Sequence, residues 1–208
     1  IDNCKGYLDF NGNGLYGGHL IGRMGTDQFN LNIEHHPQEG DTQLYIQGAM
    51  GVDELKKAWD IPNSDLIQGH LPIEGVINLP HGKKKNWEME WKSNLKGVAI
   101  NLPSPWNKKA DDEKPLDIDM VYHEDGLVSM NILYQHKDWK IDYDKKTWHF
   151  VVAEPELMGD VYYHLAQKQI DAKLSRLYLD DKLLKSQEDE KSTAWKIQDM
   201  PSLKIQVE

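Results

Sequence analysis

The chain has 208 residues, of which 39% are hydrophobic and 28% charged, and its formal net charge is −10 at pH 7. This acidity disfavours binding to nucleic acids and adhesion to anionic membrane surfaces, because both require a basic surface. The single cysteine, Cys4, precludes an intramolecular disulfide and a cysteine-based metal site, and the chain lacks a run of about 18 apolar residues that would cross a bilayer as a helix.

Segments of alternating apolar and polar residues recur roughly every 10–15 residues, a spacing typical of antiparallel strands with short connections. Successive side chains of a strand point to opposite faces, so each segment predicts one apolar and one polar face. The predicted strands cover residues 29–34, 44–47, 87–92, 116–120, 128–134, 148–152, 170–174 and 203–207. Turn signals lie between them at residues 11–14, 39–41, 81–82, 124–126 and 144–146.

Two other segments have helical features. Residues 52–59 carry apolar side chains at 52, 55 and 59, and Pro62 follows as a stop signal, which predicts a short helix. Residues 181–191 are polar and predict either a short surface helix or a solvated loop. The proline-containing stretch 103–115 predicts a loop between strands.

The absence of a strand–helix–strand rhythm favours a mainly β fold over a doubly wound one. We expect a single segment, residues 1–208, with an antiparallel, strongly curled sheet that forms a half-open groove and carries one or two short helices. The alternative is a closed β-sandwich, in which the same apolar faces pack against each other. In the groove, the apolar face would meet a capping helix, such as 52–59, or a ligand.

The residues predicted to line this groove are those that alternate in phase along the strands. A structural core is the competing interpretation of the same set. The predicted lining residues are Leu44, Ile46, Trp87, Met89, Trp91, Leu95, Ile118, Met120, Met130, Ile132, Trp148 and Phe150.

The sequence offers little evidence for catalysis. The nine histidines are scattered over the predicted strands, whereas a metal site needs three or four converging ligands. No motif of a serine nucleophile or a phosphate-binding loop is present. We therefore expect no enzyme activity, no metal and no cofactor. Two alternatives to a ligand-binding groove stay open: a non-catalytic β-sandwich that scaffolds other proteins, and an enzyme that grips sugar with aromatic side chains.

Residues 91–108 contain Ser93, Leu95, Gly97 and then Leu102-Pro103-Ser104-Pro105 with Lys108. This order resembles a segment of the YhdP branch of the AsmA-like proteins of Gram-negative bacteria, with motif positions Leu95, Gly97, Leu102, Pro103, Pro105 and Lys108. The stretches 16–22, 29–33, 71–75 and 170–181 are also similar to strands of that family. The pattern departs from it at Ile73 and Lys182, where the family often has tryptophan.

The resemblance implies an internal fragment of a longer envelope protein that is anchored in the inner membrane and lies mostly in the periplasm. It implies a β groove of the bridge-like lipid-transfer type (a "β-taco"), which carries phospholipid between the inner and outer membranes. The implied partners are phospholipid and neighbouring segments of the same chain, not nucleic acid. Contact with the membrane is expected only through parts of the full protein outside these residues.

Overall fold

The computed structural model describes residues 2–12, 14–36, 41–58, 65–81, 86–101, 107–135, 137–155, 157–178 and 202–207. These residues form fourteen strands and one helix, α1 (Val52–Ala58). The strands are β1 (Asp2–Asn11), β2 (Gly14–Met24), β3 (Asp27–His36), β4 (Asp41–Gly51), β5 (Ile67–Pro80), β6 (Trp87–Ser93), β7 (Val98–Ile100), β8 (Leu116–Tyr122), β9 (Val128–Tyr134), β10 (Lys137–Tyr143), β11 (Thr147–Ala153), β12 (Leu157–His164), β13 (Gln169–Leu177) and β14 (Ser202–Val207).

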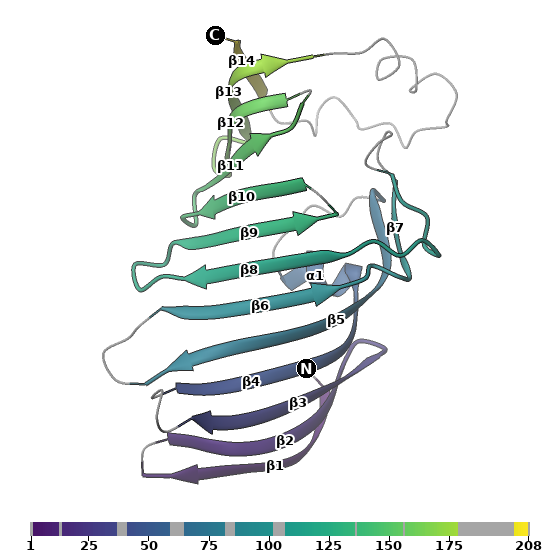
Figure 1. Ribbon diagram of the computed structural model, residues 1–208, viewed down its shortest axis with the longest axis vertical. Coiled ribbons are helices and arrows are strands. Elements are labelled where there is room, and N and C mark those ends of the chain that lie inside the picture. The colour runs from purple at the N-terminus through teal and green to yellow at the C-terminus, as the bar shows by residue number, and fades with distance from the viewer. Residues whose placement is uncertain are drawn as a thin grey trace.

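The strands form one sheet in which almost every strand pairs with its predecessor in the chain (Figure 1). The exception is the short strand β7, which pairs only with β5, so that β6 pairs directly with β8. The sheet is open, with β1 at one end and β14 at the other. The prediction of a mainly β fold is confirmed, and each predicted strand lies within an observed one.

The described strands form one layer. The main contacts between strands run between hydrogen-bonded neighbours, apart from a smaller contact between β2 and β4, and α1 packs on β4 and β5. A β-sandwich requires a second sheet face to face with the first. The sandwich alternative is therefore wrong for the described part of the chain.

The sheet departs from the predicted antiparallel pattern at its last pair, because β14 runs parallel to β13. A parallel pair needs a long crossover connection, and residues 178–201 supply a connection of that length between these strands. The prediction of a purely antiparallel sheet is thus wrong at β14 and correct for the other pairs. The predicted second helix, 181–191, lies outside the described residues.

The helix α1 matches the predicted helix over 52–58, and Trp59 and Pro62 lie outside the described residues. Asp53 and Glu54 stand in its first turn and Lys56 and Lys57 in its last, an order that complements the helix dipole. The ammonium of Lys56 donates to the carbonyl of Ile67 at 2.7 Å and so fixes α1 to the start of β5.

Candidate functional site: an apolar face of the sheet

One face of the sheet is apolar from β3 to β14, as the strand register shows. Directly opposed residues of neighbouring strands share a face. Ile77 on β5 stands opposite Met89 on β6, which stands opposite Met120 on β8, and this row continues through Met130 and Ile141. The predicted lining residues within strands all lie on this apolar face: Leu44, Ile46, Trp87, Met89, Trp91, Ile118, Met120, Met130, Ile132, Trp148 and Phe150.

The other face is polar. On β6 it carries Glu88, Glu90 and Lys92, and on β8 it carries Asp117 and Asp119. The alternation of apolar and polar residues along these strands therefore gives the single layer one apolar face and one polar face.

Most side chains of the apolar face are half-buried rather than enclosed. Met130 in the centre is buried, Met89, Trp91 and Met120 are intermediate, and Trp87 keeps 48% of its surface exposed. Burial of this kind comes from neighbours within the same layer. In the described part of the chain, the face therefore presents a broad apolar surface that only α1 and the segment around β7 cover.

Glycines on the apolar face lie beneath large side chains of the neighbouring strand. A Cβ atom on Gly75 would stand 2.2 Å from a ring carbon of Trp91, and one on Gly22 would stand 2.5 Å from the ring of Phe29. Both rings therefore lie flat over the adjacent backbone. This packing gives a large apolar area with little height above the sheet.

The helix-side edge of the apolar face is covered. We use this name for the strand ends near α1, where Val52, Leu95, Val98 and Tyr134 form a buried cluster with exposed fractions of 2% to 6%. Partly buried hydrophobic residues pack against the cluster: Leu71, Ile100, Leu116 and Trp139. Leu95, a predicted lining residue, lies after β6 inside this cluster rather than along the open part of the face.

The turn-side edge is the opposite edge, where the strands end in the turns at 123–127 and 144–146. We define it by Trp87, Tyr122, Tyr143, Trp148 and Tyr163. Trp87 and Tyr122 are exposed, with ring centroids 6.4 Å apart, and Tyr143 stacks on Trp148 at 4.3 Å. In Figure 1 this edge is on the left, and α1 and β7 lie toward the right-hand strand ends.

Comparison with models of protein families identifies the family of the chain. A family model described as YhdP protein matches residues 1–139. The chain belongs to the YhdP family. Its members are envelope proteins. No curated protein and no solved structure matches the chain. None of the described helices is long and apolar enough to cross a membrane.

The YhdP-family motif residues that the structure describes build the turn after β6. Leu95 adopts a left-handed backbone with φ of 54°, and its N–H donates to the hydroxyl of Ser93 at 2.9 Å. The carbonyl of Gly97 accepts from the N–H of His70, and a Cβ on Gly69 would stand 2.0 Å from that carbonyl oxygen. These motif positions thus hold β7 against β5. Leu102, Pro103 and Pro105 lie outside the described residues.

Lys108, the last motif residue, is a buried structural cation. Its side chain donates to the carbonyls of Val98 and Lys109 at 2.8 and 2.9 Å, and its backbone bridges to Ile100. Burial lowers the pKa of Lys108, since it disfavours the charged form. The lysine supports the helix-side edge and does not reach the open apolar surface.

Sequence analysis did not identify an ion pair on the apolar side at the helix-side edge. Lys137, opposite Tyr134 in the register, pairs with Glu154 at 2.5 Å, and both side chains are about nine-tenths buried. The other oxygen of Glu154 accepts from the indole N–H of Trp139 at 3.0 Å. No local sequence pattern predicts this pair, because Lys137 begins β10 whereas Glu154 follows β11, and the two come together only through the strand register.

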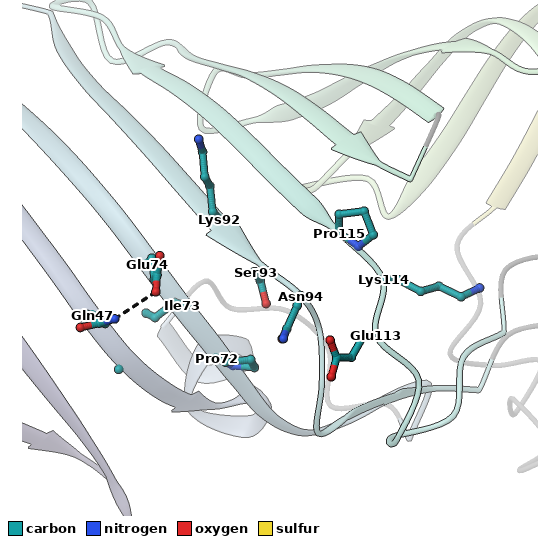
Figure 2. Close-up of a pocket in the computed structure, with 11 residues that line it drawn as sticks. Gln47, Pro72, Ile73, Glu74, Lys92, Ser93, Asn94, Glu113, Lys114 and Pro115 are labelled. Atoms are coloured by element: carbon teal, nitrogen blue, oxygen red, sulfur yellow. Dashed lines mark hydrogen bonds between the residues drawn. The ribbon is translucent and has the colours of Figure 1, made fainter.

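The polar face holds a depression between β4, β5, β6 and the segment before β8 (Figure 2). Gln47 donates to Glu74 at 3.0 Å across its floor, and Lys92, Asn94 and Glu113 also line it. Lys96, 2.7 Å from Glu113, lowers the pKa of that carboxyl group. The lining combines charged side chains such as Glu74 and Lys114 with the apolar Pro72, Ile73 and Pro115.

Most of the described histidines are dispersed. His35 and His81 are an exception, because their ring centroids are 5.3 Å apart and both rings lie within hydrogen-bond distance of the Thr42 hydroxyl. His149 contacts Asp160 at 2.7 Å and His164 contacts Asp171 at 3.1 Å, both on the polar face. The exposed His70 donates a hydrogen bond to the Asp27 carboxylate, which raises the pKa of the histidine. Among the described residues, no group of three or more potential ligands is arranged to hold a metal ion.

Proposed function

We propose that this chain is a segment of an envelope protein whose apolar face is the inner wall of a half-open groove that binds phospholipid acyl chains and conducts them between the two membranes. One observation carries the proposal. The register places the predicted lining residues from β4 to β11 on one side of a single layer, with carboxylates and lysines on the other side.

Groove curvature is supported by the small residues on the apolar face. On a concave surface side chains crowd one another, and glycine relieves the crowding; Gly22 and Gly75 stand on this face beneath the rings of Phe29 and Trp91. In Figure 1, strands β3 to β5 bend at their right-hand ends toward β7. Bulges between β1 and β2 and between β12 and β13 add further twist.

The energetics favour such a surface for lipid transfer. Exposing one methylene group to water costs about 0.8 kcal/mol, so a chain of about 16 carbons costs about 13 kcal/mol to expose fully. An apolar wall that is continuous across neighbouring strands keeps the acyl chain buried at each step. The free energy of the bound acyl chain would then change little as the chain moves along the wall. A preferred direction of transport would need a separate source of free energy.

The site we propose is non-catalytic, periplasmic and part of a longer protein anchored in the inner membrane. Neighbouring segments of the same protein are the proposed partners at the sheet ends, where β1 and β14 leave edge strands exposed. YhdP-family membership and the two-faced sheet support this assignment. The competing function, a scaffold that binds other proteins, predicts protein contacts on the apolar face instead of lipid.

Photocrosslinking in Gram-negative cells that make the full protein tests the proposal. A photoreactive amino acid at Met120 faces the apolar side, and the same amino acid at the adjacent Asp119 faces the polar side of the same strand. We expect phospholipid crosslinks from position 120 and few from 119. Met89 and Glu90 on β6 provide a second matched pair. Equal lipid labelling of both faces, or protein crosslinks alone from position 120, would refute lipid binding on this face.

A further inference from the structure

We propose that a phospholipid on the apolar face lies across the groove, with its headgroup at the turn-side edge and its acyl chains directed toward the helix-side edge. This inference rests on the proposed function and adds the orientation of the bound lipid, which the apolar character of the face does not specify.

The turn-side edge carries an almost unbroken row of amphipathic aromatic residues. Trp87 stands opposite Tyr122, Tyr143 stands opposite Trp148, and Val128 joins these two pairs in the register. Tyr163 on β12 extends the row because it stands opposite Trp148. The row therefore crosses six strands, β6 and β8 to β12.

The chemistry of this row suits the boundary between acyl chains and headgroups. Tryptophan and tyrosine have an apolar body and a polar tip, and they are enriched where lipid tails meet polar headgroups. Within the described residues, no hydrogen bond to the protein is made by the indole N–H of Trp87 or Trp148 or by the hydroxyls of the three tyrosines. The adjacent row inward contains Met89, Met120, Met130, Ile141, Phe150 and Val161, which have no such groups.

The helix-side edge is unsuited to a headgroup. Its tryptophan, Trp139, already donates its N–H to Glu154, and Glu154 is paired with Lys137. The helix α1 and the residues from Leu95 to Ile100 cover this edge, and its cluster residues are buried. An acyl chain could end against this apolar wall, whereas a hydrated headgroup would lose its water there.

The width of the face matches the length of an acyl chain. Strand β8 has seven residues and so spans about 20 Å from the turn-side edge to the helix-side edge. The acyl part of one bilayer leaflet is about 15 Å thick, half of the hydrocarbon core. A phospholipid with its headgroup at the turn-side edge would thus place its chain ends near Leu116 and Tyr134.

The turns beyond the aromatic row carry charges of both signs, with Glu124 and Asp125 exposed in the β8–β9 turn. Lys145 and Lys146 lie exposed in the β10–β11 turn, and Lys168 lies exposed in the β12–β13 turn. These ammonium groups can pair with a lipid phosphate. Asp144 in the same turn accepts backbone N–H groups of Lys146 and Thr147, so its charge is partly engaged within the turn.

Two phospholipid probes with the same acyl chains test this orientation in the full chain. One carries a photoreactive diazirine in the headgroup and the other carries it at the end of one acyl chain. Peptide mass spectrometry should place headgroup adducts near Tyr122 and Tyr143 and chain-end adducts near Leu116 and Tyr134. Reversed or indistinguishable patterns would overturn the orientation but not lipid binding. A lack of adducts on the apolar face with either probe would instead refute the proposed function.

Removing the hydroxyls provides a second test. The triple variant Tyr122→Phe, Tyr143→Phe, Tyr163→Phe keeps the rings, and we expect headgroup labelling at this edge to fall about two- to ten-fold, the effect of losing one net hydrogen bond. Tyr134→Phe, at the helix-side edge, is the matched control and should label like the wild type. Unchanged labelling of the triple variant would show that headgroups do not use these hydroxyls.

Discussion

Trp139 and Trp148 stand on adjacent strands and face the same side of the sheet, at its helix-side and turn-side edges respectively. The indole of Trp139 packs against a buried cluster and donates to Glu154, whereas Trp148 stacks on Tyr143 and makes no hydrogen bond within the described residues. The same residue type thus contributes to a closed core at one edge and to an accessible surface at the other. Stability should depend on the first edge, and lipid contact on the second.

The largest effect is expected at the helix-side edge, where a variant can disrupt the buried ion pair. Glu154→Ala leaves the ammonium of Lys137 buried without its carboxylate partner and should destabilise the fold by about 3–5 kcal/mol. Urea unfolding followed by circular dichroism measures the change. The double variant Lys137→Met, Glu154→Leu is the control, because replacing both charges by apolar groups should cost much less. Equal losses of unfolding free energy in Glu154→Ala and in the double variant would contradict the assignment of a buried ion pair at this edge.

A matched pair of truncations compares the two edges directly. Leu95→Ala removes a side chain that is 5% exposed and should cost about 2–4 kcal/mol, whereas Trp87→Ala removes one that is 48% exposed and should cost less than about 1 kcal/mol. Thermal and urea unfolding report both values. If Trp87→Ala proved the more damaging substitution, the turn-side edge would have to be part of a core.

A smaller effect is expected in the middle of the face. Gly75→Ala places a methyl group 2.2 Å from the ring of Trp91, so the ring must lift, at a cost of about 1–3 kcal/mol. Trp91→Ala should remove most of this penalty in a double-mutant cycle. Independent, additive effects would mean that the ring does not lie over this glycine.

The smallest effect is a pH dependence at Lys108. Burial lowers the pKa of Lys108 from 10.5, so the unfolded chain binds more protons between the lowered value and 10.5. The contribution of this group to stability must therefore rise with pH across that window. Urea midpoints compared between wild type and Lys108→Met should diverge in favour of the wild type as the pH approaches 10.5. Parallel curves would show that the lysine titrates normally.

The sequence predicted the two-faced sheet because period-two alternation needs only local information. Residues 128–134 form β9 with the same bounds, and they alternate except at Leu133, an apolar residue on the polar face that is 40% exposed. Strand β12 was missed, since Gly159 interrupts its alternation at a register shift. Strand β10 was also missed, although Trp139, Ile141 and Tyr143 alternate within it and could have been recognised.

The division of the apolar face into a covered and an open edge was not predictable in the same way. It depends on which strand ends come together, and this follows from the register and from α1 folding back over β4 and β5. Leu95 illustrates the difference. Its apolar character predicted the correct side of the sheet, but its left-handed backbone places it in the buried cluster.

The contact pattern of the sheet has a consequence for how the chain folds and fails. Each strand is stabilised mainly by the two strands beside it. The sheet should therefore unfold strand by strand rather than in a single cooperative step. Damage at β12 should loosen its immediate neighbours while distant hairpins keep their amide protons protected from exchange. Such a chain can also lengthen in evolution by inserting hairpins, because no opposing layer needs to be redesigned to receive them.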